Sequence, residues 1–282
     1  MDVSVLIPVY NYNISTLVTQ LINQLEKLKL NFEILLIDDC SDLSSTYLNL
    51  KVNQKNNVKY EVLTENIGRA AIRNLLFKNA KYDFCICIDC DMLVENEHFI
   101  NNYIKENEQN CILVGGHYYQ KEKPKDNNLF LHWKYGTSIE SRGKTSFMSS
   151  NFACNKNTFE QIKFNNSLKN YGHEDTLFGI LAKEKQIEIK QVNNPLLHSG
   201  IETNTVFLEK QKQAVFNLKA LYKSKFYSKK LKKHIKLISY ANIPFLGKTL
   251  KPLEPLLLKN LKSIKPNLFN LQLLKIIWWN KN

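Results

Sequence analysis

The stretch "FCICIDCD", residues 84 to 91, places an apolar, cysteine-containing run directly before two aspartates. In an extended strand Cys85 and Cys87 point to one face of a sheet, and the phenylalanine and isoleucines point to the other. An apolar run on both faces is typical of a strand buried on both sides, as in parallel sheets. Free cysteine packs there as a small hydrophobe, and the sequence lacks the further ligand pairs of a zinc site. We therefore favour buried packing over a thiol site.

Apolar runs of the same kind recur along the first third of the chain. They cover residues 3–7, 32–37 and 60–63. Between them, residues 17–28 carry apolar positions at helical spacing, and residues 66–80 are typical of a second helix. Strands that alternate with helices predict βαβ units, and so an α/β fold with a mostly parallel sheet.

Polar residues follow three of the predicted strands. They are Tyr10 and Asn11 after Pro8-Val9, Asp38 and Asp39, and Asp89 and Asp91. The carboxyl ends of parallel strands meet at one edge of a sheet, where such folds bind ligands. Acids one residue apart suit Mg²⁺ or Mn²⁺ bridging to phosphates, although acids after a strand also serve as ordinary turn and cap residues.

Length and composition allow one large domain with or without an appendage. The 282 residues are 44% hydrophobic, enough to bury a core. The start of the chain carries no secretory signal and no apolar run reaches 18 residues, so we expect a cytoplasmic protein. Charge is divided unevenly: residues 1–200 carry a net charge of −1 and residues 201–282 carry +14.

Four motifs together resemble family 2 glycosyltransferases of the GT-A fold. They are IPVYN at 7–11, IDDCS at 37–41, NIGRAAIRN at 66–74 and IDCD at 88–91. Residues 149–179 resemble the galactosyltransferase-like acceptor half of the family, in which a Glu-Asp pair begins a helix. Two positions depart from the family pattern, because Met92 replaces the usual third acid and Cys90 separates the two aspartates.

The resemblance covers roughly residues 2–222 and implies a domain organisation. We expect a GT-A domain over 1–222, with a nucleotide-sugar-binding half over 1–117 and an acceptor half over 118–222. A basic, mainly helical appendage is expected over 223–282.

The resemblance also implies roles for individual residues. Those expected to bind the nucleotide sugar are Pro8, Tyr10, Asp39, Arg73 and Asp89. Those expected to bind the metal are Asp91 and His198, and those expected to bind the acceptor are Glu174 and Asn151. Trp133 is also expected to bind the acceptor, because it lies in a polar segment over 117–144 whose aromatic rings suit a sugar face, although they equally suit a loop packed on its own domain. Asp175 is expected to be the general base. The alternatives are core packing for Tyr10, a solvated helix face for Arg73, and ordinary first-turn acids for the Glu-Asp pair.

The activity implied is transfer, with inversion, from a nucleotide-diphosphate sugar to a saccharide or lipid-linked saccharide. A UDP-sugar donor, Mn²⁺ or Mg²⁺, and a place in surface polysaccharide or lipopolysaccharide synthesis are expected. One alternative is a nucleotidyltransferase that makes an activated sugar, but the loop after the first strand lacks the glycine-rich, basic character that cradles a triphosphate. A non-catalytic membrane-associated adaptor is the other alternative. Such a protein would be expected to lose Asp91, Asp175 or His198, and all three are present. The donor sugar, the linkage and the oligomeric state stay open.

The tail over 223–282 interleaves lysines with leucine, isoleucine and tryptophan. This composition predicts contact with an anionic membrane surface, with Trp278 and Trp279 at the headgroups and the protein peripheral on the inner face of the cell membrane. Packing on the body of the protein or self-association is the alternative. Nucleic acid is not expected, because the tail contains no arginine, the usual base-reading residue.

Overall fold

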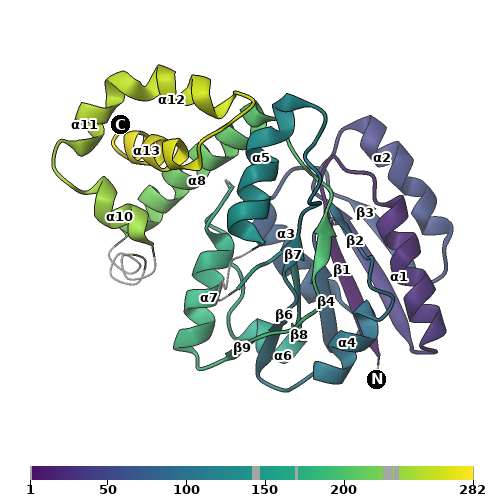
Figure 1. The fold of residues 1–282 in the computed structure, drawn as a ribbon. Coiled ribbons are helices and arrows are strands. Elements are labelled where there is room, and N and C mark those ends of the chain that lie inside the picture. The colour runs from purple at the N-terminus through teal and green to yellow at the C-terminus, as the bar shows by residue number, and fades with distance from the viewer. Residues whose placement is uncertain (1, 142–146, 169–170, 225–230, 232–234, 282) are drawn as a thin grey trace. The chain divides into compact units, whose positions relative to one another are not determined.

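The computed structural model describes residues 2–141, 147–168, 171–224, 231 and 235–281. The chain divides into two compact units (Figure 1). Unit 1 comprises Met1–Tyr119, Gly143–Lys169 and Glu174–Gly200. Unit 2 comprises Gln120–Arg142, Asn170–His173 and Ile201–Asn282. The predicted boundary after residue 222 does not coincide with this division.

Unit 1 is built on a seven-stranded sheet of order β3-β2-β1-β4-β8-β6-β9. The strands are β1 (Val3–Val9), β2 (Phe32–Asp38), β3 (Val58–Val62), β4 (Phe84–Ile88), β6 (Cys111–Val114), β8 (Asn151–Asn155) and β9 (Glu188–Gln191). Only β8 runs antiparallel to its neighbours in these described pairings. The predicted α/β fold with a mostly parallel sheet is therefore confirmed.

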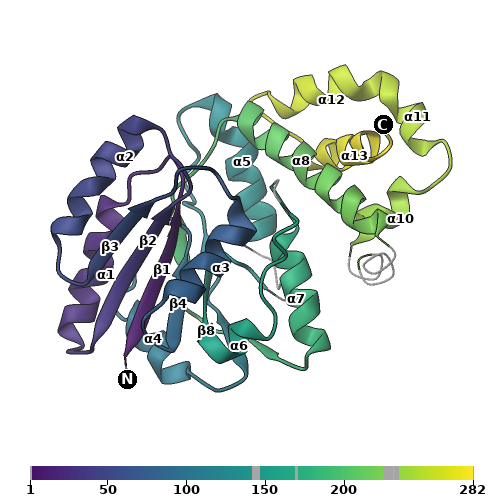
Figure 2. The same cartoon turned by 180° about the vertical axis from the view of Figure 1, so that it is seen from behind.

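Helices cover both faces of this sheet (Figures 1 and 2). They are α1 (Ser15–Lys27), α2 (Leu43–Leu50), α3 (Arg69–Asn79), α4 (Phe99–Glu106), α6 (Lys156–Glu160) and α7 (Glu174–Glu184), with a short turn η1 (Lys51–Gln54). Phe84, Ile86 and Ile88 of β4 pack in the core that includes α1 and α4. Cys85 and Cys87 pack in the core that includes α3 and α7. The alternation predicted for β4 is confirmed, and its cysteines are buried core residues.

Two predicted boundaries shift for identifiable reasons. Strand β1 continues through Pro8, which pairs with Ile37, to Val9. Its ladder with β4 ends at Leu6, so the missing N–H of Pro8 costs no bond on that side. Helix α3 begins only at Arg69, because Gly68 adopts a left-handed φ of 86° at its N-cap.

A second, three-stranded sheet of unit 1 has the order β5-β10-β7. Its strands are β5 (Met92–Leu93), β10 (Leu196–His198) and β7 (His117–Tyr118). Strand β10 pairs antiparallel with β5, with His198 opposite Met92, and parallel with β7. Residues that lie about 100 positions apart in the sequence thereby become neighbours beside the end of β4.

Unit 2 is helical in its described residues, as expected for the C-terminal region. Its elements are η2 (Asn127–Leu129), α5 (Phe130–Tyr135), η3 (Gly136–Glu140), α8 (Asn204–Lys223), α10 (Lys236–Ala241), α11 (Leu246–Leu250), η4 (Lys251–Leu253), α12 (Glu254–Leu261) and α13 (Leu268–Trp279). Helix α13 packs against α8, α10, α11 and α12. None of the helices in the described part of the chain is both long and apolar enough to cross a bilayer.

The prediction that Trp278 and Trp279 lie at lipid headgroups is wrong. Trp278 and Trp279 are 3% and 4% exposed, inside unit 2. The Trp278 indole N–H donates to Glu254 (3.3 Å), and Trp279 packs near the ring of Tyr222. Sequence composition cannot separate an apolar residue that faces lipid from one that faces a neighbouring helix, because both favour the same side chains.

Candidate active site

The carboxyl ends of β1, β2 and β4 meet at one edge of the large sheet. Strand order reverses at β1, which lies between β2 and β4, and such a switch point opens a crevice for ligands in α/β folds. Tyr10 follows β1 and is 53% exposed, which excludes core packing. Asp39 follows β2 and Asp89 follows β4. The structure thus brings these predicted donor-site residues to one edge.

Asp39 is buried and holds the loop that precedes α3. Its two carboxylate oxygens accept from the backbone N–H of Ile67 (2.7 Å) and Gly68 (3.0 Å). Burial raises the pKa of Asp39, and these two hydrogen bonds partly offset the rise. A carboxylate has further lone pairs, so contact with a nucleotide base stays a prediction beside this positioning role.

Arg73 is only 1% exposed, which excludes a solvated helix face. Its guanidinium donates to the Asp89 carboxylate (2.5 Å) and to the carbonyl of Arg69 (3.1 Å). Burial raises the pKa of Asp89, but the charges of Arg73 and Arg69 outweigh that effect and the pKa is lowered. This geometry favours a role for Arg73 in fixing an ionised Asp89 over direct contact with a base.

Asp91 and His198 are brought together by the pairing of β5 with β10. His198 Nε2 lies 3.5 Å from Asp91 Oδ2. The backbone of the turn is fixed as well, because the N–H and hydroxyl of Ser199 both donate to the carbonyl of Asp91 (2.9 Å each). The Ser199 hydroxyl also lies 2.9 Å from that of Tyr12. The two predicted metal ligands are thus adjacent, on a turn whose backbone is held by hydrogen bonds.

The side chains of Asp91 and His198 fit as ligands of a divalent cation that is shared with a diphosphate. Asp91 Oδ1 is buried and has no hydrogen-bond partner among the described residues. A buried carboxylate oxygen without a partner is costly unless a cation or ligand satisfies it. Within those residues no cluster of three or more His, Cys, Asp or Glu could hold a metal. The protein would supply two ligands, and phosphate and water would supply the rest, as Mg²⁺ and Mn²⁺ often require.

Gly200 is required for the close approach of this turn to Asp91. A Cβ at Gly200 would lie 2.7 Å from both Cβ and Oδ2 of Asp91. We expect Gly200→Ala to displace the Asp91 carboxylate, to reduce cation-dependent nucleotide binding by about tenfold or more, and to destabilise the fold by about 1–3 kcal/mol. Titration calorimetry with nucleotide and Mn²⁺, with a thermal melt, measures both. Unchanged nucleotide binding would show that Asp91 does not need this position.

Two residues that sequence reasoning did not assign lie beside His198. The ring of Tyr119 stacks on that of His198, with centroids 4.8 Å apart. The ring of His117 lies 5.4 Å from that of His198, and its Nδ1 is 2.9 Å from the Ser150 hydroxyl. The available signal was a histidine that follows Gly115-Gly116 at the end of a buried strand.

Glu174 and Asp175 begin helix α7, as predicted. Burial, reinforced by the neighbouring charge of Glu174, raises the pKa of Asp175 to about 6. The Asp175 carboxylate also accepts from the backbone N–H of Thr176 (2.6 Å). Glu174 is buried, and its Oε2 has no hydrogen-bond partner among the described residues. A carboxylate with a pKa near neutrality is suited to general base catalysis.

Arg69 interacts with both the Glu174–Asp175 pair and Asp89, and it was not assigned from the sequence. Its guanidinium lies 3.9 Å from Glu174 Oε1, and its charge lowers the pKa of Asp89. Arg69 and Arg73 of α3 are one helical turn apart and therefore share a face of the helix. The spacing of the two arginines was the signal that could have identified Arg69.

The structure places the three remaining predicted site residues in β8, β1 and α5. Asn151 is 0% exposed, and its amide bonds to the carbonyls of Gly116 and Asn194 and to the Tyr103 hydroxyl, so it holds loops together and has no surface for an acceptor. Pro8 lies within β1. Trp133 belongs to α5 of unit 2, where its indole N–H donates to Gln120, and an acceptor role for it stays a prediction.

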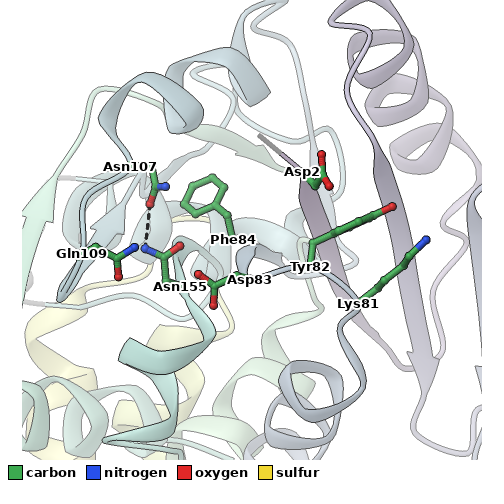
Figure 3. A pocket seen from close by; sticks show the side chains of 8 residues that line it. All are labelled: Asp2, Lys81, Tyr82, Asp83, Phe84, Asn107, Gln109 and Asn155. Atoms are coloured by element: carbon green, nitrogen blue, oxygen red, sulfur yellow. Dashed lines mark hydrogen bonds between the residues drawn. The ribbon is translucent and has the colours of Figure 1, made fainter.

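A pocket of about 340 Å³ lies at the opposite edge of the sheet, where β4 begins (Figure 3). Its lining residues are Asp2, Lys81, Tyr82, Asp83, Phe84, Asn107, Gln109 and Asn155. The Asn155 amide donates to Asn107 within this pocket (3.2 Å). Because it lies before β4 and the aspartates lie after it, the pocket is separate from the candidate active site.

The sequence pattern described as Glycosyl transferase family 2 matches residues 4–168, more than half of the chain. The chain therefore belongs to glycosyl transferase family 2. Its fold is GT-A, with the carboxyl ends of β1, β2 and β4, the paired aspartates and the acid pair that begins α7 in one unit.

Two curated relatives differ in how much of each protein is matched. Chondroitin synthase of Pasteurella multocida (strain Pm70) is 31% identical over 121 residues, which are 41% of this chain and 12% of that protein. Poly(ribitol-phosphate) beta-N-acetylglucosaminyltransferase TarP of Staphylococcus aureus (strain N315) is 28% identical over 265 residues, 82% of this chain and 76% of TarP. The chain thus spans a small part of the first relative and most of the second.

Solved structures agree on the fold. Mannosyltransferase PcManGT from Pyrobaculum calidifontis, in complex with GDP-Man and Mn²⁺, gives a TM-score of 0.52 at 12% identity, over 77% of this chain and 62% of that one. S. aureus TarS 1–349, in complex with UDP-GlcNAc, gives 0.50 at 20% identity, over 77% of this chain and 66% of that one.

Proposed function

We propose that this family 2 glycosyltransferase transfers a hexosyl or N-acetylhexosaminyl group, with inversion, from a UDP-sugar to a saccharide or polyol-phosphate acceptor. The donor proposal is supported by the complex of TarS with UDP-GlcNAc. The acceptor class is supported by the names of chondroitin synthase and TarP. The observation that carries the reaction type is Asp175, whose pKa is raised to about 6 beside the Arg69–Glu174 contact.

Asp175 would take the proton of the acceptor hydroxyl as that oxygen attacks the anomeric carbon. The bond from the anomeric carbon to the diphosphate breaks as the new bond forms, and its electron pair leaves with the nucleotide. Asp91 and His198 would hold a divalent cation, which stabilises the leaving diphosphate. Arg73 keeps Asp89 ionised and fixed, so that its carboxylate can accept from donor hydroxyls. Attack opposite the leaving group inverts the anomeric centre.

The first experiment is a screen of UDP-, GDP- and other nucleotide sugars with Mn²⁺, with Mg²⁺ and with excess chelator. We expect donor hydrolysis or transfer with a UDP-sugar that requires the cation. Release of pyrophosphate from a nucleoside triphosphate and a sugar phosphate would instead identify a nucleotidyltransferase.

We expect the pH dependence of kcat/KM to report Asp175. The base acts when deprotonated, so activity should fall tenfold per pH unit below about pH 6 and level off above it, because the pKa of Asp175 is raised to about 6. Glu174→Gln removes a neighbouring negative charge that contributes to this rise, so the acidic limb should move to lower pH. A limb that stays in place in this variant would argue against Asp175 as the titrating base.

A further inference from the structure

The turn between α10 and α11 carries a group of exposed apolar side chains in unit 2. Tyr240, Ile243 and Phe245 are 55%, 47% and 74% exposed, and Pro244 between them is also exposed. We call residues 240–245 the α10–α11 tip. Single exposed apolar residues are common on protein surfaces, whereas a cluster within six residues of chain indicates a contact surface.

Phe245 adopts a backbone conformation that its side chain disfavours. Its φ is 62° and its ψ is −12°, in the left-handed region, at the N-cap of α11. Glycine or asparagine is usual at such a position, and a bulky aromatic residue there is uncommon. The Phe245 side chain forms no hydrogen bond that caps α11, and it is largely exposed. The folding of unit 2 therefore does not account for a phenylalanine at this position. Strain of this kind is typical of functional positions.

Positive charge flanks the tip on both sides. Lys236 precedes it, Lys248 and Lys251 follow it, and all three are exposed. The sequence contains no acid from Lys236 to Leu253, and the next one, Glu254, is paired with Lys281 (2.7 Å). Residues 201–282 carry a net charge of +14, which opposes contact with a second copy of the same surface and favours an anionic partner.

We propose that the α10–α11 tip inserts into the interfacial region of an anionic lipid bilayer, with the flanking lysines at the headgroups. An exposed aromatic and aliphatic wedge supplies apolar area to the acyl boundary, and lysines close to the surface add attraction to anionic lipid. This assigns the membrane contact to Ile243 and Phe245. The terminal tryptophans, which the composition of the tail first suggested, are buried instead. The inference is independent of the glycosyl transfer proposed above.

The test is co-sedimentation of the full chain with vesicles at low and high salt. The vesicles contain either phosphatidylcholine alone or phosphatidylcholine with about 30% of the anionic lipid phosphatidylglycerol. We expect binding only to anionic vesicles, weakened by salt. Phe245→Asn should lower the partition coefficient about tenfold, since it removes one inserted aromatic ring. Each of Lys248→Glu and Lys251→Glu should lower it by at least roughly fivefold. Asparagine suits the left-handed backbone, so Phe245→Asn should melt no lower than wild type.

Phe269→Asn is the matched control. Phe269 is 65% exposed and lies at the start of α13, whereas the end of that helix adjoins α10 and α11, as the hydrogen bond from Asn280 to the Ala241 carbonyl requires. Figures 1 and 2 agree that α13 begins away from the α10–α11 turn. This variant should keep wild-type vesicle binding. Equal loss in Phe245→Asn and Phe269→Asn, full binding in Phe245→Asn, or a change of oligomeric state in ultracentrifugation without lipid would each overturn the proposal.

Discussion

Asp175→Asn is expected to lower kcat by about 10³-fold while donor affinity stays near that of wild type. The loss follows from removal of the general base, which typically contributes 10²- to 10⁴-fold, on the order of a few kcal/mol in the barrier. Asparagine retains an oxygen that can accept from the N–H of Thr176, so α7 should begin as before. Steady-state kinetics with a saturating donor, and calorimetric binding of the nucleotide sugar, measure the two quantities separately.

Glu174→Gln is the informative comparison for this variant. Glu174 contacts Arg69 and does not need to move a proton, so its loss should raise the acceptor KM and leave kcat within about tenfold. Asp83→Asn is a control for the chemistry of the substitution, because Asp83 is exposed and lies at the opposite end of β4 (Figure 3). If Asp175→Asn loses donor affinity and thermal stability together, the acid is structural and another base must be sought.

Asp91→Asn is expected to abolish cation-dependent donor binding and to lower kcat by about 10³-fold. The nucleotide affinity in Mn²⁺ should fall by at least about 100-fold, since even groups that only support metal ligands contribute 10- to 100-fold. The backbone carbonyl of Asp91 still accepts from Ser199, so the turn should survive the change.

The stability of this variant provides a second readout. Asp91 Oδ1 is buried without a partner in the described residues, so a neutral amide should leave the melting temperature of the ligand-free protein unchanged or higher. The gain in melting temperature that UDP and Mn²⁺ give the wild type should disappear in Asp91→Asn and persist in Asp83→Asn. Full activity of Asp91→Asn, or of the wild type in excess chelator, would refute metal dependence at this position.

Local pattern was enough to predict the first four strands of the large sheet, β1 to β4. Strand β4 was predicted within its observed bounds of Phe84–Ile88, because a strand buried on both faces must be apolar throughout. The start of α3 was harder to predict from the sequence. It depends on how Asp39 binds the backbone amides of Ile67 and Gly68, which is a contact between distant segments. The burial of Asn151 could not be predicted for the same reason, because only the fold reveals that its amide is fully buried.

The sequence by itself determined the class of fold, the family and the edge of the sheet at which chemistry should occur, because strand periodicity and the residues after each strand are local properties. Tertiary structure decided which side chains meet there. It brought His198 to Asp91 through a pairing of strands about 100 residues apart, and it turned Arg73 inward to Asp89. It also buried Trp278 and Trp279 and left Phe245 exposed, because burial depends on which helix faces are covered by others, and composition alone does not encode that arrangement.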